Sequence, residues 1–497
     1  KNSLFKVDDL AKDMSGRVAR GISVTSLAEM VNFLINLGST AILARILTPE
    51  DYGLIAMVFV IVTFISTFKD MGLSMATVQR KDITHEQVST LFWINLGIGF
   101  LLGGLIALSA PLISMFYDEP RLTEIVLIFS VLPIVGGMLL QQSALLKRRM
   151  RFKAMAIGRT AGTAGAFSIA IILAYMGAGY WALVVFQVTR VVIDCAIEWF
   201  LTGWIPGLPS KAEGIKSMLA FGVGFSGFNF TEHVVRKADN VLVGWKLGAA
   251  QLGFYSKAYE LMIRPINMLF VSLNPVMFSS LSRLADEPEK FSSTYKTVLE
   301  MVCLVMMPSI LFLLVDADLV IGILLGDQWD RAATLFAILG FEGLALPIAV
   351  SCRWLYVSQG KSGALFRWGV INSAITLLAV IIGINFGVEG VALGVAGSGV
   401  LVRSPLLFWL VTREGPIKMK DLYGATFLPL LSGGLGALAV YFFRGLVELT
   451  PLLELAASGG VMLGVSLLVL MLFPAGRRNL KQLRRLKAVL TGRGAAG

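Results

Sequence analysis

Two apolar segments of this 497-residue chain contain polar and charged side chains at matching positions, 200 residues apart. The first set is Glu29, Asn32, Asn36, Ser39 and Thr40, and the second is Asn229, Glu232, Arg236, Asp239 and Asn240. Each set steps by three or four residues, so each forms a stripe along one face of a helix. Polar groups are costly in hydrocarbon and usually face one another or a wet cavity. The stripes therefore predict a cavity wall that can bind a polar solute or an ion.

Other charged side chains inside the apolar segments extend this candidate site. The residues expected to line the cavity and bind substrate are Asn32, Asn36, Arg190, Asn229, Arg236, Arg264, Arg353 and Arg403. The carboxylates expected to couple an ion are Glu29, Glu232 and Asp239. Arg190 has an alternative, because its spacing also allows pairing with Asp194 and Glu198 on the same helix. Arg264 can likewise pair with Glu260 or extend to the membrane surface.

The elements that position these side chains are apolar helices of membrane length. Hydrophobic residues make up 56% of the chain, charged residues only 15%, and the mean hydropathy is +0.77. A soluble protein carries about a quarter charged residues. Apolar runs of about 20 residues, enough to cross a hydrocarbon core ~30 Å thick, recur along the chain. We expect an all-α integral membrane protein with about fourteen transmembrane helices, near 23–45, 52–72, 88–112, 122–146, 154–176, 179–203, 217–246, 252–275, 297–315, 332–358, 364–385, 388–411, 425–444 and 452–473.

The basic residues alternate between successive loops. Most of the 43 Lys and Arg lie in every second loop and at the two ends of the chain, for example at 147–153 and 477–493. The intervening loops are acidic, with Glu50, Asp118 and Asp327. This alternation follows the positive-inside rule. It predicts a multi-pass membrane protein with both termini in the cytoplasm. The net charge of +11 thus reflects topology, and we expect no nucleic-acid partner.

The chain also contains an internal repeat. Residues 47–53 and 247–253 keep a leucine and a glycine in register, and 177–183 correspond to 387–393 at a spacing of 210. Parallel repeats are one way in which transporters are built. The repeat predicts two pseudo-symmetric six-helix bundles followed by a helix pair. The expected order is an amphipathic cytoplasmic N-terminus at 1–20, bundles at 21–203 and 217–411 joined by a cytoplasmic linker at 204–216, a helix pair at 412–473, and a basic cytoplasmic tail at 474–497.

No pattern in the sequence indicates an enzyme or a bound metal. Cys195, Cys303 and Cys352 lie in separate apolar segments, and neither His85 nor His233 has a partner at metal-ligand spacing. The sequence has no phosphate-binding loop for ATP and no nucleophile motif. We expect no cofactor, no metal and no catalytic residue. Transport would be driven by the solute's own gradient, or coupled to a proton or sodium gradient.

Four motifs in this order resemble the polysaccharide transporter family of flippases. They are LARILTPEDYG at 43–53, RMRF at 149–152, DNVLVG at 239–244 and GDQW at 326–329, and the similarity runs from about residue 20 to 415. The family belongs to a superfamily that includes multidrug extruders and lipid II flippases. The resemblance implies two bundles facing each other across a cavity that opens alternately to each side. It also implies transfer of a polyprenyl-pyrophosphate-linked oligosaccharide from the inner to the outer leaflet for lipopolysaccharide or exopolysaccharide synthesis.

The implied substrate explains the intramembrane charges. A lipid-linked saccharide has a polar head that cannot cross hydrocarbon, and its pyrophosphate attracts cations. The implied partners are membrane lipids and, at later steps of polysaccharide synthesis, a polysaccharide polymerase and export proteins. Two alternatives remain open. An ion-coupled multidrug extruder would share the fold, although its often cationic substrates fit the intramembrane arginines less well. A membrane glycosyltransferase or ligase would need a large external loop, and the acidic loops here are short.

Overall fold

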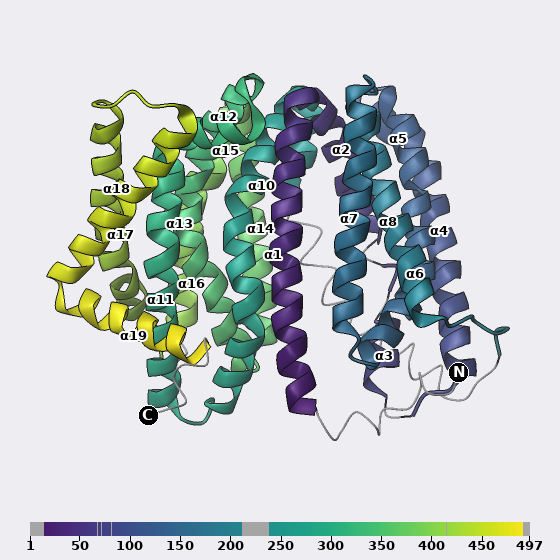
Figure 1. Ribbon diagram of the computed structural model, residues 1–497, viewed down its shortest axis with the longest axis horizontal. Helices are drawn as coiled ribbons and strands as arrows, with labels where there is room; N and C mark the ends of the chain where they lie inside the picture. The colour runs from purple at the N-terminus through teal and green to yellow at the C-terminus, as the bar shows by residue number, and fades with distance from the viewer. Residues whose placement is uncertain are drawn as a thin grey trace. The chain divides into compact units, whose positions relative to one another are not determined.

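The computed structural model describes residues 14–490, except 67, 71, 81, 211–237 and 414, and it describes side chains between residues 28 and 482 of that range. Within these limits the chain is helical and contains no strand. The chain divides into two compact units, Lys1–Gly253 and Phe254–Gly497. The long helices of each unit run alongside one another (Figure 1). The bundle, linker and tail boundaries expected from the repeat stay predictions.

Unit 1 is a bundle of helices. Its members are α1 (Met14–Ile46), α2 (Pro49–Ser66), α3 (Leu73–Gln79), α4 (His85–Tyr117), α5 (Arg121–Phe129), α6 (Val131–Arg148), α7 (Phe152–Tyr175), α8 (Trp181–Thr202) and the start of α10 (Ala238–Arg283). The largest contacts join α7 with α8, α4 with α6, α1 with α7, and α6 with α8. The side chains at these contacts are mostly apolar or small, whereas α4 exposes a row of leucines on its other side.

Unit 2 contains the rest of α10 and a second group of helices. They are α11 (Pro288–Val315), α12 (Ala317–Leu325), η3 (Asp327–Trp329), α13 (Asp330–Ser358), α14 (Ser362–Gly383), η4 (Ile384–Phe386), α15 (Gly387–Ser398), η5 (Gly399–Arg403), α16 (Ser404–Thr412), α17 (Met419–Arg444), α18 (Pro451–Leu472) and α19 (Pro474–Leu490). The central helix α11 packs against α13 and α17, and α14 packs against α15. Aromatic side chains such as Trp354 and Tyr295 are fully buried in this unit.

Ten segments of the described chain are long and apolar enough to cross a membrane. This confirms the expected all-α integral membrane fold. Two of these segments, Ala238–Arg283 and Ser362–Thr412, have 46 and 51 residues. About 20 residues suffice for one crossing, and the backbone breaks at Gly248 (φ 85°) and Gly387 (φ 82°) divide these segments. The expected helix at 179–203 is α8, which is absent from the ten because it carries three charged residues. The count of fourteen stays a prediction.

Two local features were not expected from the sequence. The predicted helix at 388–411 is interrupted by a π-helical turn, Gly399–Arg403, which divides it into α15 and α16. The predicted helix at 122–146 is likewise divided, into α5 and α6, next to Ser130. Periodicity does not reveal such interruptions, because apolar residues continue on both sides of them. The apolar residues 319–325 lie in the nine-residue helix α12, which is too short to cross a membrane.

The described part of the expected linker is held against α4. Residues 203–210 have no regular secondary structure, yet Trp204 is only 5% exposed. The Trp204 indole Nε1 donates to Nδ1 of His85 at 3.0 Å, and the Gly207 amide donates to the Ser89 hydroxyl at 2.9 Å. The indole of Trp93 donates to the Gly207 carbonyl at 2.8 Å. These bonds fix the direction in which the chain leaves α8.

Candidate functional site

A charged face of unit 1 begins with Arg159 on α7. Its Nη1 lies 3.8 Å from Oε1 of Glu29 on α1, and both side chains are more than half exposed. This distance fits an ion pair that can open without disturbing the core. The sequence interpretation selected Glu29 but missed Arg159. The sequence does indicate Arg159 as a candidate, because it is a charged residue inside the predicted helix at 154–176.

The neighbouring helix α8 adds Arg190 and Asp194 to this face. Both are half-buried. The Arg190 guanidinium lies 5.9 Å from the centre of the Phe186 ring, a distance that allows a cation–π contact. Asp194 lies within electrostatic range of both Arg190 and Arg159. Its Oδ1 is buried and accepts no hydrogen bond in the described structure.

A glycine brings α7 close to this carboxylate. A Cβ placed on Gly162 would lie 2.5 Å from Oδ1 of Asp194, so a larger residue would displace the Asp194 side chain. Because an α-helix rises 1.5 Å per residue, Arg159 lies ~24 Å and Arg190 ~14 Å from the turn that joins α7 to α8. Asp194 lies between them at ~20 Å. Measured from this turn, all three charges fall within the ~30 Å thickness of a hydrocarbon layer, where an unpaired charge is costly.

Glu198 lies one turn along α8 from Asp194 and within electrostatic range of Arg159. It is 8% exposed, and the Ser143 hydroxyl of α6 donates to its carboxylate. The predicted alternative, pairing along one helix among Arg190, Asp194 and Glu198, stays a prediction. A carboxylate bonded to α6 helps to fix the α6–α8 contact.

The polar stripe of α1 lies partly at a helix contact. The Asn32 amide donates to the Thr160 hydroxyl on α7 at 3.0 Å, and Asn32 is 8% exposed. The Asn36 amide donates to the Asn32 carbonyl on its own helix at 2.7 Å. Asn32 therefore joins two helices of unit 1. Such interhelical hydrogen bonds satisfy polar groups in a membrane. A cavity role for either asparagine stays a prediction.

The second stripe lies mostly beyond the residues that the structure describes. Asn229, Glu232 and Arg236 are outside the described residues. Asp239 is in the first turn of α10, where its Oδ1 accepts a hydrogen bond from the Asn240 amide at 2.8 Å. The predicted match between the two stripes can therefore be followed only on α1.

The arginines of unit 2 form separate groups. Arg264 bonds to Glu260 one turn earlier on α10, and Lys257 lies 2.8 Å from the same carboxylate. Arg403 donates to Oε1 of Glu342 and to the Val395 carbonyl, both at 2.7 Å. The Arg403–Glu342 pair is buried, so its geometry fits a structural ion pair better than a substrate contact. Arg353 is half-buried on α13. The substrate roles predicted for Arg264, Arg353 and Arg403 are untested.

No group of three metal-ligating side chains occurs in the part of the chain that is described. Cys195, Cys303 and Cys352 are buried free cysteines. The charged face offers electrostatic interactions. Two guanidiniums can hold a phosphate or another anion, and adjacent carboxylates can pair with them when no anion is bound.

A family model described as "Polysaccharide biosynthesis protein" matches residues 42–334, more than half of the chain. The chain belongs to this family. The lipopolysaccharide biosynthesis protein WzxC of Escherichia coli K12 is 23% identical over 381 residues, covering 75% of this chain and 77% of that protein. The succinoglycan biosynthesis transport protein ExoT of Rhizobium meliloti is 24% identical over 370 residues, covering 74% of each.

The fold also matches a solved transporter structure. The lipid II flippase MurJ in an inward closed conformation aligns with a TM-score of 0.71 at 13% identity, covering 90% of this chain and 97% of that one. This likeness establishes the fold. The family, its relatives and the fold place the chain among transmembrane transporters of polysaccharide biosynthesis and not among enzymes.

Proposed function

We propose that the protein moves a polyprenyl-pyrophosphate-linked oligosaccharide from the inner to the outer leaflet of a bacterial cytoplasmic membrane by alternating access. Three facts support this. Relatives are named as lipopolysaccharide biosynthesis and succinoglycan transport proteins, the fold is that of a lipid II flippase, and unit 1 carries an arginine-containing face at membrane depth.

The Arg159–Glu29 pair, with Arg190 and Asp194 beside it, carries the proposal. A saccharide head needs hydrogen-bonding groups, and a pyrophosphate needs cations. Arginine presents a planar fork of donors that matches phosphate oxygens. A cationic drug would be repelled by Arg159 and Arg190.

The exposed geometry of the pair suggests how the charges are balanced. Without substrate, Glu29 neutralises Arg159. When the pyrophosphate binds, it replaces Glu29 as the partner of the guanidinium, and the released carboxylate becomes free to take up a proton or a sodium ion. Glu29 is thus our candidate for ion coupling in the described chain. Glu232, Asp239 and Arg236 stay candidates for the same roles, and a polymerase and export proteins stay proposed partners.

The test is a transport assay in cells that depend on this protein for surface polysaccharide. Arg159→Ala and Arg190→Ala should each lower export at least about tenfold. A hydrogen bond to a charged group contributes about 1.5–3 kcal/mol, and about 1.4 kcal/mol corresponds to a tenfold change. Lipid-linked saccharide should accumulate in the inner leaflet. Arg159→Lys should restore only part of the transport, because a point charge replaces the planar fork.

Arg283→Ala is the matched control, since it removes an exposed arginine from the end of α10. It should leave export unchanged, and membrane levels of all variants should be equal. Normal export by an Arg159→Ala, Arg190→Ala double variant at normal protein level would refute the proposed site. Glu29→Gln should change the dependence of export on the ion gradient; an unaltered dependence would exclude Glu29 as the coupling group.

A further inference from the structure

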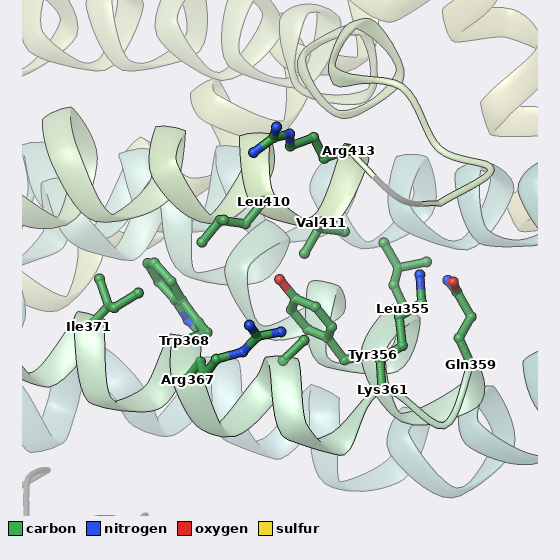
Figure 2. Close-up of a pocket in the computed structure, with 11 residues that line it drawn as sticks. Leu355, Tyr356, Gln359, Lys361, Arg367, Trp368, Ile371, Leu410, Val411 and Arg413 are labelled. Carbon is green, nitrogen blue, oxygen red and sulfur yellow. The ribbon is translucent and has the colours of Figure 1, made fainter.

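The basic side chains of unit 2 are arranged in two different ways. Some of them line a pocket of about 250 Å³ between α13, α14 and α16. Figure 2 shows the Arg413 guanidinium extending away from Arg367, on the other side of Leu410 and Val411, so these two arginines do not face a common anion. The basic side chains of α19, by contrast, gather on one face of a helix.

The helix α19 is amphipathic. Arg477, Arg478 and Lys481 are exposed, and their spacing places them on one face. On the opposite face Gly476 and Asn479 are buried. The sequence between 474 and 497 contains seven lysines and arginines and no acidic residue. A helix with this pattern is typical of those that lie on an anionic membrane surface.

The buried face holds α19 against three other helices of unit 2. Leu480 packs on a cluster formed by Leu304 of α11, Leu428 of α17 and Leu470 of α18. A Cβ on Gly476 would overlap the Leu470 carbonyl, so a larger residue would not fit at this turn. The orientation of α19 about its own axis is therefore fixed, and its basic face points away from these helices.

The start of α19 is tied to the end of a membrane-length helix. α18 ends at Leu472 and α19 begins at Pro474. Proline disfavours helical backbone at the preceding residue, and Phe473 is extended (φ −98°, ψ 136°), so the chain changes direction here. The 22 residues of α18 measure ~33 Å, enough to cross a ~30 Å hydrocarbon core. Since a single residue separates the two helices, α19 starts at the surface of that core.

From this point α19 runs across the bundle. Figure 1 shows it crossing from the end of α18 toward α11. Nη2 of Arg478 lies 3.5 Å from Oε2 of Glu300 on α11. Arg477 and Lys481 have no acidic partner in the described part of the chain. The helix thus keeps two exposed cations without a counter-charge near the level of the membrane surface.

We propose that α19 is an interfacial helix whose basic face binds the anionic headgroups of membrane phospholipids, with Arg477 and Lys481 as headgroup contacts. The topology predicted from charge places 474–497 in the cytoplasm, so the headgroups are those of the inner leaflet. That leaflet carries a negative surface potential, which attracts basic segments next to transmembrane helices. A tail that only sets topology would carry the same charge, but it would not need a face packed on three helices.

Fluorescence quenching of the full-length protein in liposomes tests this. A fluorophore on an Ala475→Cys variant reports on the first turn of α19, because Ala475 is exposed whereas the native cysteines are buried. Phosphatidylglycerol and phosphatidylcholine, each spin-labelled near its headgroup and present in equal amounts, are the two quenchers. Phosphatidylglycerol should quench several-fold more strongly. Salt at about 1 M should remove most of this preference, because the screening length falls to ~3 Å.

An Arg477→Ala, Lys481→Ala double variant in the same labelled protein should lower the preference at least about threefold, since each cation adds to the attraction. Arg477→Lys should retain it, because a point charge suffices at a charged surface. The control Arg283→Ala, Lys290→Ala removes the same charge from the α10–α11 turn and should also retain it.

Equal quenching by the two lipids overturns the proposal, as does a preference that survives unchanged in the double variant. Quenching by neither lipid would place α19 in water or against another protein, and it overturns the proposal as well. Since the readout does not involve transport, these outcomes leave the transport proposal for Arg159 and Arg190 standing.

Discussion

Gly53 and Gly253 are 200 residues apart and meet where α2 crosses α10. A Cβ on Gly253 would lie 3.3 Å from the Gly53 amide nitrogen and would overlap the Pro49 carbonyl. A Cβ on Gly53 would overlap the Ala249 carbonyl. The two positions that the internal repeat keeps in register are therefore in backbone contact within unit 1. Only glycine has room at this crossing.

This crossing predicts a strong steric effect. Gly253→Val should destabilise the protein by more than about 3 kcal/mol, because the new side chain meets backbone atoms that cannot move independently. The level of folded protein in the membrane and its thermal unfolding in detergent would measure this. Gly104→Val is the control, since no atom lies within 4 Å of a Cβ there. Equal levels for the two variants would contradict the close approach.

The buried pair of Arg403 and Glu342 predicts a different pattern. Arg403→Ala should cost about 3–5 kcal/mol of stability, because it leaves a carboxylate buried without its partner. Arg403→Met combined with Glu342→Leu should recover most of that loss. The exposed pair of Lys290 and Glu287 serves for comparison, and Lys290→Ala should change stability by less than about 1 kcal/mol. Thermal unfolding of the purified variants checks the series. Full export by the stable double variant would assign the pair a structural role.

Asp316, between α11 and α12, predicts a pH effect on stability. Its side chain is fully buried, and burial raises its pKa to about 6, although Arg444, 3.5 Å away, lowers it. A folded-state pKa above the unfolded value means that the protonated acid stabilises the fold. This contribution is complete below about pH 4 and is lost as the pH rises through about 6. Asp316→Asn should therefore lose less thermal stability than the wild type between pH 4 and pH 7.

Asp318 is the matched control for this prediction. Burial acts to raise the pKa of its carboxyl, but hydrogen bonds and charge from Arg444 outweigh burial and lower the pKa. Its contribution to stability is present above the unfolded pKa and is lost only as the pH falls below about 4. Asp318→Asn should thus lower stability equally at pH 5 and pH 7. A parallel pH dependence of the wild type and the Asp316→Asn variant would contradict the raised pKa of Asp316.

The segment at 203–210 should be protected from hydrogen exchange. Ser89→Ala removes the acceptor of the Gly207 amide, and Trp93→Phe removes the donor to the Gly207 carbonyl. Each lost bond should cost about 1 kcal/mol, which raises the exchange rate of this segment about fivefold. Hydrogen exchange followed by mass spectrometry measures it. Thr123→Ala, on α5, should leave the exchange of 203–210 unchanged. Fast exchange of 203–210 in the wild type would show that the segment is not held.

Topology is open to direct labelling. Single cysteines at 150, 290 and 360 should react only with reagents that reach the cytoplasm, and cysteines at 118, 328 and 448 should react from outside. The reason is the alternation of basic and acidic loops. A membrane-impermeant thiol reagent applied to intact cells distinguishes the two groups. External labelling at 150 would reverse the assigned orientation.

The helical class and the membrane location follow from the sequence. Both depend on composition and on apolar length, which are local properties of the chain. The repeat was also visible, because Gly53 and Gly253 recur at equivalent positions. The contact between these two glycines could not be predicted, since spacing alone does not show that two segments touch. The sequence likewise identified Glu29 and Arg190 as charges inside apolar helices but gave no partner for either.

Only the tertiary structure decided which partners these charges have. Arg159 meets Glu29 because α7 packs against α1, whereas Arg403 is buried against Glu342 because a π-helical turn brings it to α13. The same residue type thus lies on an open face in one unit and in a closed core in the other. A helix position fixes the direction of a side chain relative to its own axis. Whether that direction meets a carboxylate, a lipid or water depends on which helix packs beside it, and packing is a property of the whole fold.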